Sequence, residues 1–211
     1  MCQHFRYLCV VMRLLVLLLL LLPPPKNPKT LTIVLKDRMR ERDNQTFRKR
    51  ALRHQAPILE AYNGRELKNR LDTLATRGYE KVMIYSHGDY NGLVSTHMEG
   101  VFLYVPHQRG ETRYISVDEL TQSLTQVADS GAKVVLVSCR MKGVAERIAK
   151  RSTFSVVYAA DSCSPVNTTD PKTRLKIAET GEFFCNKGFF QVRKDEKNTL
   201  HTIPLGKFLR P

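Results

Sequence analysis

The sequence predicts an α/β protein with a mainly parallel central sheet. Over residues 31–160, short apolar runs rich in β-branched residues alternate with segments whose apolar residues recur at helical spacing. Strands and helices that alternate in this way form βαβ units, in which successive strands lie parallel. After residue 182 the apolar runs follow one another without a helical segment, which predicts a hairpin-rich C-terminal part. The 211 residues, 42% of them hydrophobic, suit one domain.

Residues 1–22 are a hydrophobic leader, and residues 14–22 are all Leu or Val after Arg13. A basic residue ahead of a short Leu run resembles a secretory signal peptide, whereas a bilayer span needs about 20 apolar residues. No small-residue cleavage site follows, so an uncleaved anchor and a wrongly assigned start remain open. The prediction is a secreted or membrane-tethered protein, or a cytoplasmic one if the start is wrong. Sequons at Asn44 and Asn167 fit a secretory route.

The positive charge lies at the two ends of the chain. Of the net charge of +14, residues 1–57 carry +9, residues 165–211 carry +4, and the middle of the chain is nearly neutral. We therefore predict a basic linker or arm over 23–57 and a domain over 58–211, whose first strand is expected at 31–35. Basic ends attract polyanions or an anionic membrane surface, although a solvated arm is the simpler interpretation. No nucleic-acid-binding signature is present.

Each helix is predicted from its start signal and its apolar spacing. Asn63-Gly64 precedes a helix over 65–76, with Gly78 after it, and the capping box of Ser116 and Glu119 begins a second helix that Gly131 ends. A short helix is expected at 143–150. The charged segment 36–53 is interpreted as an exposed helix or a mobile loop.

The predicted strands are β-branched apolar runs bounded by turn residues. They cover residues 31–35, 81–88, 101–105, 112–115, 133–139, 154–160, 182–185, 189–193 and 200–203. The runs at 101–105 and 112–115 are expected to pair as a hairpin, as are 182–185 and 189–193 around Asn186-Lys187-Gly188.

Two of these strands end on residues with catalytic chemistry, His87 and Cys139, which are 52 residues apart. Neighbouring parallel strands release their C-terminal residues at one edge of the sheet, where open α/β sheets place their sites. An imidazole beside a thiol can protonate a departing amine. Gly88 lets backbone approach a substrate, so its N–H and that of Cys139 are candidate oxyanion donors. The helix expected after Cys139 favours its thiolate.

The chain has five cysteines, at positions 2, 9, 139, 163 and 185. If Cys163 and Cys185 pair, Cys139 is the remaining thiol of the mature domain. All three are equally compatible with small apolar residues in the core.

An apolar strand ending in Ser86-His87-Gly88, followed by one ending in Ser138-Cys139, resembles the caspase-like (clan CD) cysteine peptidases. The order and context are closest to toxin autoprocessing protease domains and CHAT peptidases. The resemblance implies a caspase-like three-layer sandwich over about 31–165 and an endopeptidase with a His–Cys dyad acting on peptides or proteins.

The resemblance also implies that an inositol phosphate could activate the enzyme by binding basic residues near the C-terminus. The candidates for this polyanion site are Lys187, Arg193, Lys194 and Lys197. Asp161, after the strand at 154–160, is a candidate for a substrate pocket that selects a basic side chain, or else a cap or turn residue. The basic segment 36–53 is a candidate site of self-processing.

Other functions are less well supported by the sequence. No metal is expected, because the histidines and cysteines lack ligand spacing, and no serine-hydrolase elbow, phosphate-binding loop or dinucleotide fingerprint is present. The alternatives are a catalytically silent α/β module that binds polyanions or a membrane through its basic ends, and an amidase or transpeptidase on the same scaffold.

Overall fold

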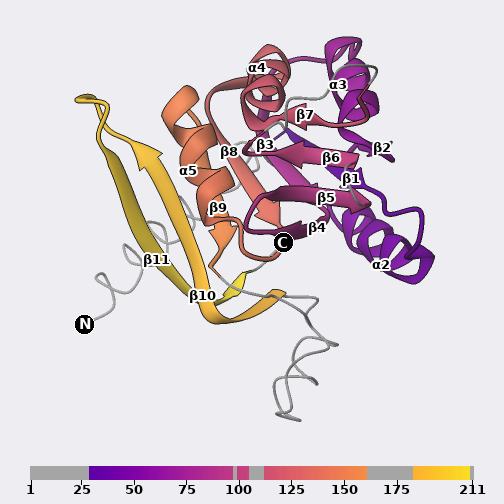
Figure 1. The fold of residues 1–211 in the computed structure, drawn as a ribbon. Helices are drawn as coiled ribbons and strands as arrows, with labels where there is room; N and C mark the ends of the chain where they lie inside the picture. Colours follow the sequence, from indigo (N-terminus) through magenta and orange to yellow (C-terminus); the bar gives the residue numbers. More distant parts are fainter. Residues whose placement is uncertain (1–28, 97–98, 105–111, 161–182, 210–211) are drawn as a thin grey trace, which may run out of the picture.

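A seven-stranded sheet forms the centre of the protein (Figure 1). The computed structural model describes residues 29–96, 99–104, 112–160 and 183–209. The strands, in spatial order, are β2 (Ile58–Ala61), β1 (Thr30–Leu35), β3 (Tyr79–Tyr85), β8 (Ala128–Val137), β9 (Ser155–Ala159), β10 (Phe183–Lys194) and β11 (Leu200–Leu209). The first five strands are parallel to one another, whereas β10 runs antiparallel to both of its neighbours, β9 and β11. The predicted α/β class with a largely parallel sheet is therefore confirmed.

Helices cover both faces of this sheet. They are α2 (Glu41–Leu52), α3 (Gly64–Asp72), α4 (Val117–Val127) and α5 (Lys142–Arg151). Neighbouring residues of β1 point to opposite faces: Ile33 packs in the cluster that contains α3, α4 and α5, whereas Val34 packs with Ala51 of α2. The apolar runs are thus strands buried on both sides, which is why they lack polar alternation.

Two predicted helices begin where expected but end early. The side chain of Asn63 caps α3 by accepting a hydrogen bond from the Glu66 N–H, and Ser116 and Glu119 form the expected capping box of α4. However, α3 ends at Asp72, because Thr73 caps it and the chain then leads into β3. Similarly, α4 ends at Val127 and passes directly into β8, so Gly131 lies inside that strand with φ +80°.

A small second sheet lies beside the carboxyl end of β3. It has the order β4 (His87–Asp89), β5 (Gly92–Thr96), β6 (Glu99–Phe102) and β7 (Ile115–Ser116). The predicted hairpin between 101–105 and 112–115 is wrong, because β6 pairs with β5 in antiparallel fashion and with β7 in parallel. Glycine explains the choice: a Cβ on Gly92 would lie 2.0 Å from the Val101 carbonyl oxygen, so these two strands approach where only glycine fits.

The second predicted hairpin, around Asn186-Lys187-Gly188, is also wrong. These residues form an irregularity inside the continuous strand β10, where Gly188 takes φ +84°. The chain reverses later: Asp195 accepts hydrogen bonds from the N–H groups of Lys197 and Thr199 and closes the turn to β11. Residues that are typical of a turn thus form a β-bulge here.

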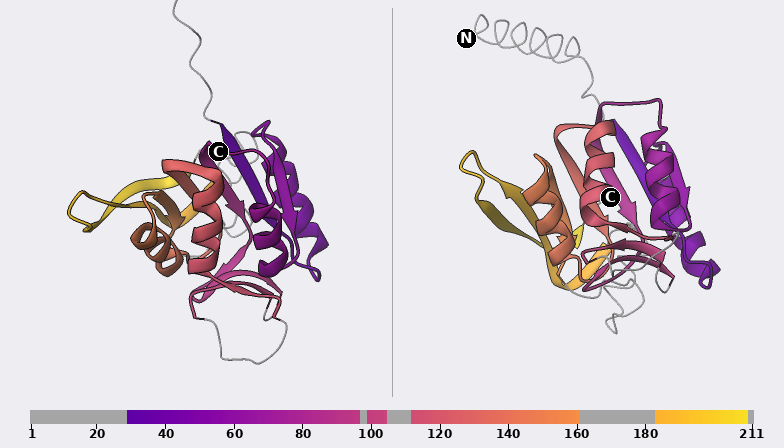
Figure 2. Two further views of the ribbon diagram at one scale, coloured as in Figure 1. Left: turned by 90° about the horizontal axis from the view of Figure 1, so that it is seen from above. Right: turned by 45° about the horizontal axis from the view of Figure 1, so that its top comes forward.

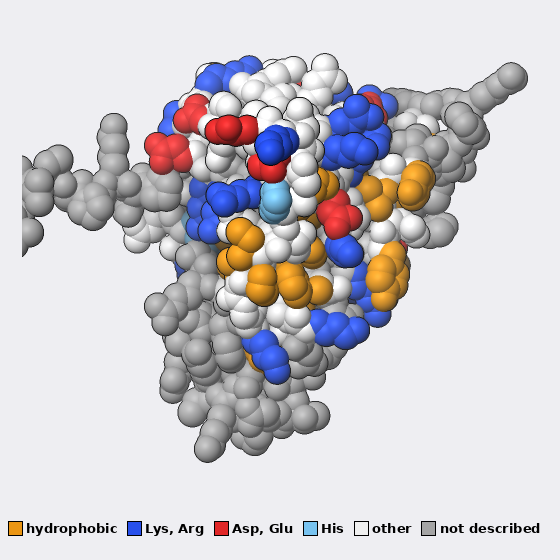
Figure 3. Space-filling view, turned by 90° about the vertical axis from the view of Figure 1, so that its left-hand side faces the viewer, with side chains coloured by type: hydrophobic (Ala, Val, Ile, Leu, Met, Phe, Trp, Pro, Cys, Tyr) orange, Lys and Arg blue, Asp and Glu red, His pale blue; other side chains and the backbone are white. Residues whose placement is uncertain are grey.

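The hairpin of β10 and β11 projects from the side of the protein (Figure 2). Side chains 201–207 are exposed on this strand. Among them, Ile203 and Leu205 are hydrophobic, and Figure 3 shows hydrophobic side chains among Lys and Arg on this side of the molecule.

Part of the predicted basic arm belongs to the folded body. Strand β1 lies inside the sheet, and residues 41–52 form α2, whose Phe47 and Ala51 pack against one face of it. Asn44, one of the two sequons, is buried with its Nδ2 donating to the Asp37 carbonyl, so the folded protein offers no accessible amide there.

Several predictions lie outside the described residues. They concern the leader 1–22, Asp161, Cys163 and Asn167. Within the described ranges, none of the helices has the length and apolar character needed to cross a membrane.

Candidate active site

The ends of β3 and β8 bring the two predicted catalytic residues to one edge of the sheet. The strands are adjacent and parallel, with Tyr85 opposite Val137. One residue further on, the buried hydroxyls of Ser86 and Ser138 share a hydrogen bond of 2.7 Å. His87 and Cys139 follow these serines directly. The predicted adjacency of the two strand ends is therefore confirmed, while the catalytic roles of the two side chains stay predictions.

Gly88 lies against the turn that carries Cys139. A Cβ at this position would be 2.5 Å from the Cys139 carbonyl oxygen and 2.5 Å from Cε of Met141. Any other residue would push β4 away from the turn, because a Cβ cannot approach backbone oxygen that closely. The structure thus explains why glycine follows His87, and its role as an oxyanion donor remains a prediction.

Cys139 occupies a tight turn between β8 and α5. Arg140 adopts the left-handed conformation with φ 58°, and the Met141 N–H donates to the Ala159 carbonyl at 3.1 Å. A non-glycine residue in this conformation costs of the order of 1 kcal/mol and persists only where its surroundings hold it. Cys139 is half-buried and lies three residues before Lys142, where α5 begins. The effect of this helix end on the thiolate stays a prediction.

His87 is held by α2 on the other side. Its Nε2 lies 3.2 Å from Oδ2 of Asp43, and its ring centroid is 5.3 Å from that of Phe47. The distance is that of an ion pair, and Nε2 is buried with no further polar partner among the described residues. The contact is therefore mainly electrostatic, and it is strongest when the imidazole is protonated.

The surroundings of His87 favour its neutral form. Burial is the largest effect and lowers the pKa of the imidazole below its usual value, and the charge of Arg40 acts in the same direction. Asp43 and Asp37 oppose this and raise the pKa. A neutral imidazole can accept the thiol proton and later release it to a leaving group, which is what the predicted dyad requires.

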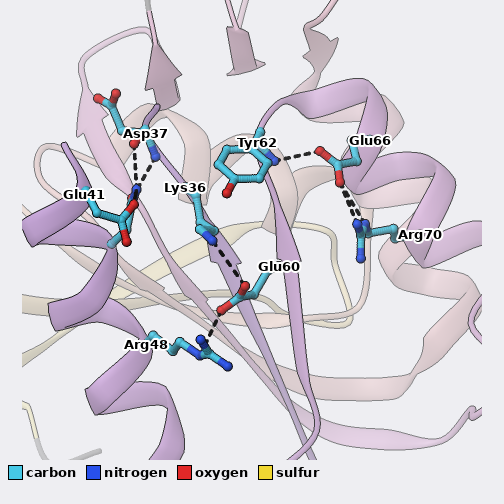
Figure 4. Close-up of polar contacts among 9 residues, drawn as sticks. Lys36, Asp37, Glu41, Arg48, Glu60, Tyr62, Glu66 and Arg70 are labelled. Carbon is cyan, nitrogen blue, oxygen red and sulfur yellow. Dashed lines mark hydrogen bonds and ion pairs between the residues drawn. The ribbon is translucent and has the colours of Figure 1, made fainter. Parts of the chain in front are cut away.

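A polar clamp fixes α2 over this edge. The Asp37 N–H donates to Oδ1 of Asn44 at 2.8 Å, and Nδ2 of Asn44 donates back to the Asp37 carbonyl at 2.6 Å. Figure 4 shows this contact at Asp37 together with a second one, in which Lys36 and Arg48 both pair with Glu60 of β2. The helix that carries Asp43 is thus tied to the ends of β1 and β2.

Sequence reasoning missed α2 as a part of the site. Its 12 residues are dominated by charge, which led to the prediction of an exposed segment. The signal that could have found it is the i, i+4 spacing of Asp43, Phe47 and Ala51, which places all three on one helix face.

The predicted polyanion residues do not form one cluster. Phe189 of β10 pairs with the carboxyl end of β9, so Lys187 lies near the edge that holds His87 and Cys139. Val192 pairs near the amino end of β9, and the other three residues therefore lie at the far side of the sheet: Arg193, Lys194 and Lys197. Asp161 is not described, so its predicted place in a substrate pocket stays a prediction. Cys185 is buried in the core on the α2 side.

No protein-family model and no curated protein matches this chain. Within the described ranges, no three His, Cys, Asp or Glu side chains gather as a metal site would require.

Proposed function

We propose that the protein is a cysteine endopeptidase of caspase-like type, in which Cys139 is the nucleophile and His87 the acid and base. The observation that carries this proposal is the pairing of β3 with β8, which sets Ser86-His87 beside Ser138-Cys139 at the carboxyl edge of the sheet. The strand order, the helices on both faces and the small sheet after His87 fit the three-layer fold that the proposal needs.

The reaction begins with transfer of the Cys139 proton to His87. The thiolate attacks the carbonyl carbon of a peptide, and the N–H groups of Cys139 and Gly88 stabilise the resulting oxyanion. His87 then gives its proton to the departing amine, which leaves a thioester on Cys139. Water, deprotonated by His87, hydrolyses the thioester and restores the thiol.

The environment of each group supports its role. Burial lowers the pKa of His87, so the imidazole is ready to accept a proton near neutral pH. The start of α5 favours negative charge on the sulfur of Cys139. The close approach of Gly88 brings β4 onto the same turn, where its backbone can face a bound carbonyl.

Polyanion activation is a separate part of the proposal and depends on where the four basic residues lie. Since Lys187 is separated from Arg193, Lys194 and Lys197, an inositol phosphate could contact only the last three together at the hairpin turn. The competing function, a silent module that binds polyanions, would use the same hairpin and would not require Cys139.

Mass spectrometry of peptides incubated with the protein tests the proposal. Wild type should cleave internal peptide bonds, and Cys139→Ala and His87→Ala should each abolish cleavage. His201→Ala is the matched control, because His201 is exposed on β11 and pairs with Asp195 away from the dyad. Cleavage that survives Cys139→Ala, or absence of cleavage of any peptide by wild type, would contradict it.

Self-processing is tested on the protein alone. Wild type and Cys139→Ala should differ in their fragments if the chain cleaves itself, with the basic segment 36–53 as the first place to look. However, α2 occupies most of this segment, so cleavage there would require the helix to unfold. Identical fragments from both proteins would remove self-processing from the proposal.

A further inference from the structure

Asp43 is the acidic side chain next to His87, and it comes from a helix that we did not predict to be part of the site. Its Oδ2 lies 3.2 Å from Nε2 of His87. The His87 side chain is 26% exposed and that of Asp43 is 44% exposed, so the contact is partly shielded from solvent.

We propose that Asp43 is a positioning residue for His87: it holds Nε2, so that Nδ1 is the nitrogen that exchanges a proton with Cys139 and with the leaving amine. The proposal rests on the function proposed above and adds a third member to the His–Cys pair. Nε2 is the nitrogen that contacts the carboxylate and is buried, which leaves Nδ1 for the reaction.

The surrounding contacts hold Asp43 more firmly than an ordinary surface ion pair. Phe47, one helical turn after Asp43, packs its ring beside the imidazole. Asn44, the next residue, is buried and bonds twice to the backbone of Asp37. Asp43 therefore precedes two anchored residues in the same helix, so the backbone that carries its short side chain is already ordered by the fold.

An oriented carboxylate has two effects on an imidazole. It selects the ring orientation and tautomer, and it stabilises the imidazolium that forms when the thiol gives up its proton. The charged groups that act on His87 are Arg40 and Asp43 of the α2 segment and Asp37 after β1, with the thiol of Cys139 at the end of β8. Asp43 and Asp37 favour the protonated ring, whereas Arg40 and burial oppose it.

The first measurement is independent of peptidase activity. In Cys139→Ala protein, NMR titration of the His87 ring should give a lower pKa when Asp43→Asn is added, because a stabilising negative charge is lost. Glu41→Gln is the matched control, since it removes one exposed acid from the same first turn of α2 and should leave the titration unchanged. An unchanged His87 titration in Asp43→Asn would overturn the proposal.

The second measurement uses the enzyme with Cys139 present. Asp43→Asn should lower kcat/KM roughly ten- to a hundredfold, and Asp43→Glu should restore part of the loss. Because the reaction starts from a neutral His87, activity falls as His87 gains a proton, and the acid limb of the pH profile should move to lower pH in Asp43→Asn. A merely structural effect would lower kcat/KM without moving this limb.

The outcomes separate this proposal from the proposed function. If wild type cleaves peptides but Asp43→Asn has the same kcat/KM and pH profile, the peptidase function is supported and the proposed role of Asp43 is wrong. If wild type does not cleave peptides but the NMR titration of His87 responds to Asp43→Asn, the electrostatic pair of Asp43 and His87 exists and the peptidase function is wrong.

Discussion

The two basic ends of the protein have very different structural roles. The N-terminal basic segment forms α2, which packs Phe47 and Ala51 on the sheet and presents Asp43 to His87. The C-terminal basic segment forms the β10–β11 hairpin: β10 pairs with β9 inside the sheet, whereas side chains 201–207 of the outermost strand β11 are exposed. Similar charge thus accompanies different packing: one face of α2 covers the sheet, whereas β11 is the outermost strand of the sheet.

The largest expected effect comes from placing a charge under α2. Ala51 is fully buried, so Ala51→Asp should lower the free energy of unfolding by about 3 kcal/mol or more, the cost of a buried carboxylate without a partner. Leu205→Asp on the exposed strand β11 should cost about 1 kcal/mol or less. Urea unfolding of both variants measures the difference, and equal losses would show that α2 is not packed as described.

A pair of glycine substitutions compares the dyad edge with the hairpin. In Gly88→Ala the new Cβ would meet the Cys139 carbonyl oxygen at 2.5 Å, so the rate of Cys139 alkylation should fall about a hundredfold as the turn is displaced. Gly206→Ala meets no atom within 4 Å, and its φ of +93° strains only the hairpin, so alkylation should stay within about twofold. Equal rates of Cys139 alkylation in the two variants would show that Gly88 does not contribute to the site.

The two side-chain clamps should differ in strength. Asn44→Ala removes two hydrogen bonds to the buried Asp37 backbone and a longer one to Glu41, and should destabilise the protein by about 1–3 kcal/mol, measured by urea unfolding. Asp195→Ala removes the hydrogen bonds from the N–H groups of Lys197 and Thr199 and the contact with His201, all at an exposed turn where water replaces them, so the loss should be smaller. The reverse order would mean that the hairpin turn, rather than α2, limits stability.

The smallest effect is a pH dependence of stability on the α2 side. Burial lowers the pKa values of His54 and His87 below the unfolded value of 6.5, so the unfolded chain binds more protons than the folded protein as the pH falls through that value. Stability should therefore decrease from pH 7 toward pH 5. His54→Gln should flatten this decrease in thermal unfolding curves, and a steeper decrease would contradict the direction of the shift.

The strands could be predicted because parallel strands that are buried on both faces have sequences of unbroken apolar residues. The runs predicted at 81–88 and 133–139 correspond to the carboxyl parts of β3 and β8, although His87 and Gly88 belong to β4 of the small sheet, and the order of the segments required parallel pairing. The adjacency of the two strand ends that carry His87 and Cys139 could be predicted in this way, since it depends only on local pattern and on the handedness rules of α/β sheets.

The remaining features depend on tertiary packing that a local pattern does not determine on its own. The turn signal at Asn186-Lys187-Gly188 became a bulge because β10 pairs continuously with its neighbours on both sides. The position of α2 depends on Phe47 and Ala51, two apolar side chains within a charged segment, and on the buried Asn44 clamp. Its contact with His87 therefore became visible only in three dimensions.

The most direct test of the account is the pH dependence of Cys139 alkylation by a thiol-reactive peptide electrophile, followed by intact-mass spectrometry. In the folded protein Cys139 should react faster at pH 6–7 than the same thiol in urea, because His87 and the start of α5 stabilise the thiolate, and His87→Ala should remove most of the advantage. A folded-state rate no greater than that in urea, or one unaffected by His87→Ala, would contradict the dyad.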